Sequence, residues 1–436
     1  MLAGMSISHR DANALLRRIL ENHTADEIER RLRPKPEKPL PPRVPGASLT
    51  SPEAVARRWR LVEAHVSAAG RAALHDEAAA REHTTFAHNV ENFLGTVKVP
   101  VGLAGPLRVN GTYAQDDFYV PLATTEAALV ASYHRGALAI SESGGCSALT
   151  HAEGVSRAPG FAFCTLHEAG VFVAWALGQL EEFKSRAEAT TRHGKLEEMR
   201  VTVEGNHVYL TFDFLTGNAA GQNMVTVATQ AICDYVAQNS PVPPRHVFVE
   251  ANLSGDKKAS AQSFQTVRGK KVSAEVRVAR ATLARRLRTT AEKMEAYWRM
   301  SALGGVMSGT IGVQGHYANG LAALYLATGQ DVACVSESAV GVTRFEADPC
   351  DGSLYACVTL PNLIVGTVGG GTGLPSQRAS LEILQVIGKD ARCLAEVAAA
   401  LALAGELSII AALSVGEFTR AHRKLSGRAE PQARMA

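Results

Sequence analysis

Residues Met300–Asp331 read MSALGGVMSGTIGVQGHYANGLAALYLATGQD, and no charged residue occurs in this stretch before its last position. Glycines recur at helical spacing, at Gly305, Gly309 and Gly312, with larger apolar residues around them. A helix that is apolar on all sides is buried. Each glycine inside a helix costs about 1 kcal/mol relative to alanine, so close packing must compensate. The pattern predicts a buried central helix around which a large domain is built.

A transmembrane span is the alternative for this stretch. Its length is sufficient to cross a bilayer, and spaced small residues suit the pairing of helices in lipid. However, Gln314, His316 and Asn319 lie in the middle of the run, and the sequence contains no other candidate span. The buried helix is therefore favoured, with Asp331 as the acid that ends it.

The composition describes a globular protein with room for two or three domains, since the chain has 436 residues, of which 46% are hydrophobic and 20% charged. A net charge of +3 gives no basis for binding nucleic acid or a membrane surface. The seven cysteines form no CxxC pair, which suits a reducing compartment. The N-terminal sequence lacks the apolar core of a signal peptide. These features predict a soluble, cytoplasmic protein of enzyme size.

The N-terminal part of the chain reads as a separate helical module, residues 1–88. It contains a proline-rich stretch, residues 34–45, that is typical of a stiff linker. Ser51 followed by Pro52 predicts a helix start, with serine as the N-cap and proline at the first helical position. That helix is expected to continue to about residue 80.

Residues 159–251 have a pattern of their own, in which strands and helices alternate in the order β-α-β-β-α-β. The expected strands are 160–166, 198–203, 207–214 and 246–250, and the expected helices are 168–189 and 221–238. This order is typical of a ferredoxin-like domain. The prediction is an α+β fold in which this small domain is inserted into a large one, formed by residues 89–158 and 252–436.

Several polar segments could carry chemistry, but each also has an ordinary structural interpretation. Glu126 lies where a helix begins and could serve only as a cap. The acid–base run 256–258 is a turn by composition, and such runs are usually solvated. Asp331 could simply end a helix, and His422 could complement a helix dipole. The glycine loop 366–372 fits a tight turn as well as it fits the approach of a phosphate.

Six motifs give these segments more weight together than singly. They are ENFLGTVKVPVGLAGPL from residue 91, VPLATTEAALVAS from residue 120, SGDKK from residue 254, ATGQD from residue 327, GTVGGGT from residue 366 and AGELSIIAALSVGEF from residue 404. In this order and spacing, over about residues 85–425, the chain resembles the 3-hydroxy-3-methylglutaryl-coenzyme A (HMG-CoA) reductase family. The form VPVGLAGPL is similar to the branch that includes the eukaryotic catalytic domains. The membrane anchor of animal and plant members is not seen, so the resemblance implies a soluble prokaryotic form.

The resemblance implies an acid–base set of Glu126, Lys257, Asp331 and His422. The family reduces a thioester to an alcohol in two hydride steps, so the cofactor implied is NADPH, and coenzyme A is part of the substrate. The ammonium group of Lys257 would stabilise the oxyanion, and Glu126 would protonate the developing alkoxide. Asp331 would tie Lys257 and Glu126 into one coupled network, and His422 would protonate the departing thiolate.

The resemblance also implies ligand contacts but no metal. The implied substrate contacts are Arg157, Asp256, Lys258, Arg299 and Asn319, with Ser132, Arg135 and Leu138 for coenzyme A. The implied NADP contacts are Thr191, Arg192, Asn218, Ala219, Ala220, Asn223, Gly369, Gly370 and Gly371. Thr191-Arg192 falls where NADP-using members carry a Ser-Arg pair. The chain departs from the family at residue 218, where the expected DAMGMN reads NAAGQN.

Two other functions stay open from the sequence. One is a non-catalytic relative that binds acyl-CoA, although such a protein would be expected to lose part of the acid–base set. The other is a reductase of a different acyl-CoA. The family's active sites lie between subunits, so a homodimer or homotetramer is expected.

Overall fold

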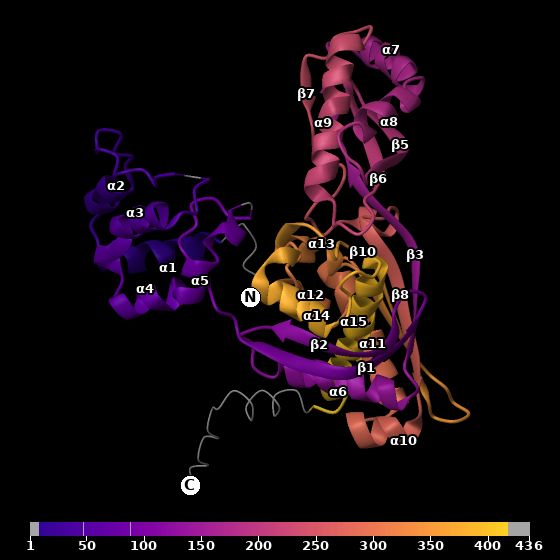
Figure 1. The fold of residues 1–436 in the computed structure, drawn as a ribbon. Coiled ribbons are helices and arrows are strands. Elements are labelled where there is room, and N and C mark those ends of the chain that lie inside the picture. The colour runs from indigo at the N-terminus through magenta and orange to yellow at the C-terminus, as the bar shows by residue number, and fades with distance from the viewer. Residues whose placement is uncertain (1–7, 47, 88, 417–436) are drawn as a thin grey trace. The chain divides into compact units, whose positions relative to one another are not determined.

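The computed structural model describes residues 8–46, 48–87 and 89–416, and Figure 1 shows its elements. The chain divides into two compact units. The first comprises Met1–His83 and Val90–Gly95, and the second comprises Thr84–Asn89 and Thr96–Ala436.

The first unit is helical, as the sequence predicts. Its helices are α1 (His9–Leu20), α2 (Ala25–Leu32), α3 (Pro52–Val62), α4 (Ala68–Leu74) and α5 (Glu77–Arg81). The Ser51 side chain accepts a hydrogen bond from the Ala54 amide, and proline occupies the first turn, so the predicted start of α3 is confirmed. The expected length is wrong, because α3 ends at Val62 and two further helices follow.

The second unit is organised on a ten-stranded sheet. The strands of its larger part are β1 (Val101–Gly111), β2 (Gln115–Ala123), β3 (Cys146–Arg157), β8 (Gly269–Val278), β9 (Val342–Ala347) and β10 (Leu354–Leu363). β1 pairs antiparallel with β2 and parallel with β3. From β3 the order continues antiparallel through β8 and β10 to β9.

Helices pack against this sheet. They are α6 (Leu129–Glu142), α10 (Arg280–Thr282), α11 (Ala291–Ser308), α12 (Tyr317–Thr328), α13 (Val335–Ser338), α14 (Pro375–Ile383) and α15 (Ala391–Ser414). Figure 1 shows α15, in yellow, enclosed by its neighbours; it contacts α6, α11, α12 and strands β8 and β10. Almost every residue of α15 is buried, so it is the central helix of the core.

The predicted position of the central helix is wrong. The stretch 300–331 is not one helix, because α11 ends at Ser308, followed by Gly309 in the left-handed region, and α12 begins only at Tyr317. At Gly312, φ is +92°, and a Cβ atom there would come within 2.2 Å of the Gly341 carbonyl oxygen. The glycines therefore break the helix and allow a close backbone approach.

The last turns of α11 are also exposed, whereas the sequence predicts burial. The exposed fractions are 76% for Met300, 67% for Leu303, 75% for Val306 and 84% for Met307. Among the described residues one helix, α15, is long and apolar enough to cross a membrane, and 83% of its most apolar window is buried inside the protein. Its apolar length is thus accounted for by the core.

The inserted part has the predicted β-α-β-β-α-β order, with its first helix divided in two. Its strands are β4 (Gly160–Ala162), β5 (Lys195–Glu204), β6 (His207–Leu215) and β7 (His246–Phe248), and its helices are α7 (Leu166–Leu177), α8 (Leu180–Glu188) and α9 (Gln222–Asn239). The pairings give the strand order β7-β4-β6-β5. A separate apolar core, rich in phenylalanine, lies beneath this sheet.

Strand β3 joins the two parts of the second unit, and the sequence gives no expectation for it. Residues 146–154 pair with β1 and β8, and the last residues, Val155–Arg157, pair with β6 of the inserted part. The sheet is therefore continuous from the larger part into the smaller one. Arg157 lies at the junction, which places its side chain near residues from both parts.

Candidate active site

Lys257 and Asp331 form an ion pair with 2.7 Å between Nζ and Oδ2. Lys257 lies in the turn that follows β7, with φ at +55°. The hydrogen bond that Lys257 donates to Asp331, together with the negative charge of Asp331, raises the pKa of Lys257 above its usual value. Each side chain is 40% exposed, so the ammonium group is both partnered and accessible to a ligand.

The backbone after α12 places Asp331. The helix ends at Thr328 and is followed by Gly329, whose φ is +71°. Gly329 lies against Gly371, because a Cβ atom added to Gly329 would come within 2.3 Å of the Gly371 carbonyl oxygen. Asp331 then caps a short 3-10 turn, since its Oδ1 accepts a hydrogen bond from the Ala333 amide at 3.0 Å. One carboxylate oxygen thus holds the backbone and the other holds Lys257.

Glu126 and Asn319 form a second pair, in which Asn319 Nδ2 donates to Glu126 Oε2 at 2.8 Å. Glu126 precedes α6, and its amide donates to Thr124 Oγ1 at 3.0 Å. Asn319 lies in the first turn of α12. Of the expected network, the structure shows the Lys257–Asp331 contact, and it adds a contact between Asn319 and Glu126.

Arg157 is nearly enclosed, with 5% of its side chain exposed. Its guanidinium group lies 2.8 Å from Asp256 and 3.5 Å from Glu250, and it also donates to Gln222. These partners engage its two terminal nitrogens, whereas its buried Nε has no hydrogen-bond partner among the described residues. Burial raises the pKa of Asp256, but the hydrogen bond from Arg157 and the charge of Arg268 outweigh burial and lower it overall.

The two other cations expected at the substrate differ in position. Lys258 is exposed beside Lys257, and its Nζ donates to the Asp256 carbonyl oxygen at 2.8 Å. Arg299 pairs along the surface of α11 with Glu295 at 2.6 Å. Lys258 therefore shares a turn with the Lys257–Asp331 pair, whereas Arg299 belongs to a different element.

The residues expected at coenzyme A lie on α6 beside α15. Ser132 Oγ donates to Ser408 Oγ at 2.9 Å, and Arg135 contacts the hydroxyl and carbonyl oxygens of Ser408 at 3.0 and 2.6 Å. Leu138 is half-buried on the same helix. Ser408 is a residue that the sequence reasoning missed, and it connects this group to the core helix.

The two segments expected at the cofactor lie side by side. The Asn218 carbonyl oxygen accepts a hydrogen bond from the Thr367 amide at 2.9 Å, and Ala219 pairs with Val368 as a parallel bridge. The backbone at Ala220 packs closely against Gly366. Asn218 Oδ1 also accepts from the Ala391 amide at the start of α15, so asparagine supplies the acceptor that an aspartate would supply there.

The glycine loop has the open side that a ligand would need. Gly369 and Gly370 have φ of +77° and +55°, and an added Cβ atom would meet nothing within 4 Å at either position. Gly371 instead packs against Gly329. Across the inserted part, Arg192 and Asn223 are exposed, and Thr191 closes a turn by accepting from the His193 amide at 3.2 Å.

Two buried side chains that the sequence does not single out, Gln330 and Glu406, connect the segments on either side of α12 to the glycine loop and to α15. Gln330 precedes Asp331 and hydrogen-bonds both the amide and the carbonyl group of Gly366, at 2.8 and 3.0 Å. Glu406 of α15 accepts from the Gly315 and His316 amides ahead of α12, and burial raises its pKa. The sequence signal in both cases is only a polar residue within an apolar run, which a surface position would equally explain.

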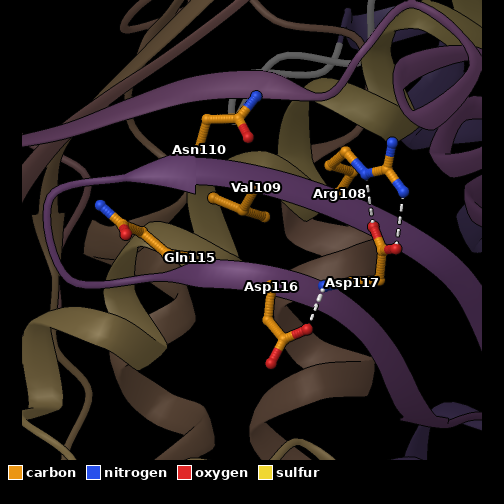
Figure 2. Close-up of a pocket in the computed structure, with 6 residues that line it drawn as sticks. All are labelled: Arg108, Val109, Asn110, Gln115, Asp116 and Asp117. Atoms are coloured by element: carbon orange, nitrogen blue, oxygen red, sulfur yellow. Dashed lines mark hydrogen bonds and ion pairs between the residues drawn. The ribbon is translucent and has the colours of Figure 1, made fainter.

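A separate surface pocket lies on the hairpin of β1 and β2 (Figure 2). Arg108 and Asp117 form a two-pronged ion pair there, with both distances 2.8 Å. The other residues that line it are Val109, Asn110, Gln115 and Asp116, so none of the expected site residues contributes. His422 lies outside the described residues. Within the described ranges no group of three or more His, Cys, Asp or Glu could hold a metal ion.

The fold and these contacts define a class of protein. It is an α+β protein with an inserted ferredoxin-like domain and a lysine–aspartate pair, Lys257–Asp331, connected through Gln330 to an open glycine loop. Such a combination is suited to acid–base chemistry beside a phosphate-bearing cofactor.

Known proteins identify the family. The sequence profile of a family described as hydroxymethylglutaryl-coenzyme A reductase matches residues 54–427. The chain therefore belongs to the hydroxymethylglutaryl-coenzyme A reductase family. The resemblance seen in the sequence is confirmed.

Individual relatives carry the name of the same family. The chain is 42% identical over 345 residues to the 3-hydroxy-3-methylglutaryl-coenzyme A reductase of Pyrococcus horikoshii, covering 77% of this chain and 83% of that one. It is 42% identical to the enzyme of the same name from Aeropyrum pernix, covering 78% and 82%. Among solved structures, the class II reductase of Streptococcus pneumoniae bound to NADPH has a TM-score of 0.62 and 21% identity, covering 82% of this chain and 96% of that one. That last likeness supports the α+β fold.

Proposed function

We propose that the protein reduces 3-hydroxy-3-methylglutaryl-CoA to mevalonate and free coenzyme A, using two hydride transfers from NADPH. Membership of the family supports the reaction. The observation that carries its assignment to residues is the pair between Lys257 and Asp331, 2.7 Å apart and accessible. It supplies a fixed positive charge where an oxyanion can develop.

The residues divide the reaction between them. In the first step a hydride adds to the thioester carbonyl carbon, and the ammonium group of Lys257 stabilises the resulting oxyanion. The carbon–sulfur bond then breaks, coenzyme A leaves as a thiolate, and His422 protonates it. In the second step a hydride adds to the aldehyde, and Glu126 supplies the proton that converts the alkoxide to the alcohol. Asn319 orients Glu126 for this transfer.

We place NADPH between the inserted part and the glycine loop. The support is the contact between the segment from Asn218 and the loop from Gly366, together with the open side at Gly369 and Gly370. Backbone amides there can approach a pyrophosphate without interference from side chains. Arg192 lies in the inserted part as an exposed guanidinium for the ribose phosphate. NADPH supplies the hydride, and the protein holds it in position.

One assay separates this function from the alternatives. Purified protein is incubated with HMG-CoA and NADPH, and oxidation of the cofactor is followed. Substrate-dependent oxidation is expected. No oxidation with any acyl-CoA would point to a non-catalytic acyl-CoA-binding protein, and oxidation only with a different acyl-CoA would change the substrate.

The acid–base residues are tested in the same assay. Lys257→Ala and Glu126→Gln should each lower kcat at least about 10²-fold, the scale of a lost oxyanion donor or general acid. Lys184→Ala is the matched control, because Lys184 also forms an exposed pair, with Glu181 at 2.9 Å, but in the inserted part. The control should keep its kcat. Near-normal turnover in either site variant would show that the site is misplaced.

We also infer that the protein works as a homodimer or homotetramer in the cytoplasm. The exposed apolar turns of α11 support association, because monomeric proteins rarely expose such patches. All seven cysteines are unpaired, which fits a reducing compartment. The division into residues 1–88, an inserted domain 159–251 and a large domain is supported by the separate apolar core of the inserted part.

A further inference from the structure

Lys257 is held at both ends by carboxylates from one short segment. Its Nζ lies 2.7 Å from Asp331 Oδ2, and its backbone amide donates to Glu337 Oε1 at 2.9 Å. Asp331 caps the 3-10 turn that begins this segment, and Glu337 lies in α13, which follows directly. The ammonium group and the backbone of Lys257 are thus fixed against the same rigid turn.

The backbone of Lys257 needs such a partner. Its φ of +55° lies in the left-handed region, which is unfavourable for a residue with a side chain. Residues persist in this conformation where their surroundings hold them. The hydrogen bond to Glu337 is made by the amide of this very residue, so it bears directly on the direction in which the lysine side chain leaves the turn.

Glu337 is itself held by a buried cation. It is fully buried, and its second oxygen accepts from Arg268 Nε at 2.7 Å. Arg268 also donates to Asp256 Oδ1 at 2.7 Å. Glu337 therefore holds Lys257, and Arg268 holds the residue before it. An ion pair that served only the core would need neither contact with this turn.

We infer that Glu337, oriented by Arg268, is a positioning residue that directs the ammonium group of Lys257 towards the reacting carbonyl oxygen. This inference rests on the proposed role of Lys257. Glu337 is buried and acts on the substrate only through Lys257. Because a misplacement of about 1 Å at a catalytic group can cost about 10²-fold in rate, a loosened turn would reduce turnover while the cofactor site kept its form.

The first test is Glu337→Gln. The glutamine side chain has one oxygen and one NH2 group where glutamate has two oxygens. If the oxygen accepts from the Lys257 backbone amide, the NH2 group must face the N–H group of Arg268, and two donors then oppose each other. We expect kcat on HMG-CoA to fall about tenfold or more, with the KM for NADPH unchanged. Glu396→Gln is the matched control, since Glu396 is also a fully buried glutamate and accepts from the Tyr113 and Ala114 amides at 2.8 and 2.9 Å. It should lower Tm and leave kcat unchanged.

A double variant separates positioning from stability. Replacing a buried ion pair by apolar residues of similar size often preserves or increases stability. The variant Arg268→Met with Glu337→Leu removes both charges and leaves the Lys257 amide without its acceptor. We expect Tm to recover relative to Glu337→Gln and kcat to stay low. Recovery of kcat together with Tm would overturn the inference.

Hydrogen exchange on the unaltered protein provides a test that needs no variant to fold. The amide of Lys257 should exchange slowly, and exchange as fast as in an open loop would overturn the inference. The activities of two variants distinguish an error in this inference from an error in the proposed active site. An inactive Lys257→Ala with a fully active Glu337→Gln would reject the positioning role alone, whereas an active Lys257→Ala would reject the site.

Discussion

The ion pair between Lys257 and Asp331 matters more for holding the ammonium charge of Lys257 in position than for the stability of the fold. Both side chains are 40% exposed, and exposed ion pairs contribute only about 0–1 kcal/mol. Their effect on ionisation is more useful. The partner raises the pKa of Lys257, so the ammonium form persists to higher pH than in a free lysine.

This shift predicts a pH effect. Stabilisation from the pair is fully present below the ordinary lysine pKa and is lost as the pH rises through the raised value. In Asp331→Asn the pKa of Lys257 should return towards its ordinary range, so the alkaline limb of the kcat profile should move to lower pH. The profile is measured from neutral to alkaline pH in both proteins. An alkaline limb at the same pH in both would show that another group controls it.

Arg192 allows a prediction on cofactor choice. NADP differs from NAD by a ribose phosphate, which a forked guanidinium binds well. Arg192 is exposed next to the turn closed by Thr191. Arg192→Ala should raise the KM for NADPH at least about tenfold, a loss of about 1.4 kcal/mol. NADH is the internal control, since it has no phosphate and its KM should hardly change. Unaltered NADPH affinity would contradict the assignment.

At the scale of elements, the order of strands and helices in the inserted part can be predicted from the sequence because the patterns are local. In the inserted part, the expected strands are bounded by turn residues. In the first unit, the helix start at Ser51-Pro52 likewise depends only on neighbouring residues. The sequence predicts the central helix in the wrong stretch for a physical reason. In 300–331 the glycines are used for positive φ and close backbone contact. In α15, Glu396 and Glu406 look like surface residues, yet both are buried against backbone amides.

The packing of α6 on α15 predicts a stability effect. At Gly136 of α6 an added Cβ atom would lie 1.8 Å from the Ala404 carbonyl oxygen. This oxygen belongs to the backbone of α15, so no side-chain movement can relieve the clash. Gly136→Ala should therefore destabilise the protein by at least about 1–3 kcal/mol, as overpacking does. The matched control is Gly170→Ala in α7, where nothing lies within 4 Å. That change should be neutral or stabilising by up to about 1 kcal/mol. Thermal unfolding of both variants measures the difference, and an equal Tm would refute the close contact.

For the whole molecule, the sequence predicts one site that contains Lys257, Asp331, Glu126 and Asn319, and the structure shows two contacts among them, Lys257 with Asp331 and Asn319 with Glu126. The sequence does not indicate the buried residues that hold Lys257, which are Glu337 and Arg268. Arg268 and Glu337 are charged residues far apart in the chain, and only the folded sheet and α13 bring them within 2.7 Å. Burial of a charge depends on tertiary packing, which local patterns do not encode.

The exposed end of α11 has a consequence for the assembly. Met300, Leu303 and Met307 are separated by three and four residues, so they share one helix face with Val306 beside them, and each is at least two-thirds exposed. A second copy of the chain covering this face would remove the apolar surface from water.

Val306→Glu should therefore shift the protein to monomers, because a charge buried without a partner opposes association. Val203→Glu on β5 is the matched control, since Val203 is also exposed but lies on the inserted part, away from this face. Light scattering at assay concentration should give an oligomer for the unaltered protein and for Val203→Glu, and a monomer for Val306→Glu. If all three have the same mass, α11 does not form the contact. A loss of kcat that accompanies the loss of mass would further show that the active site needs the second copy.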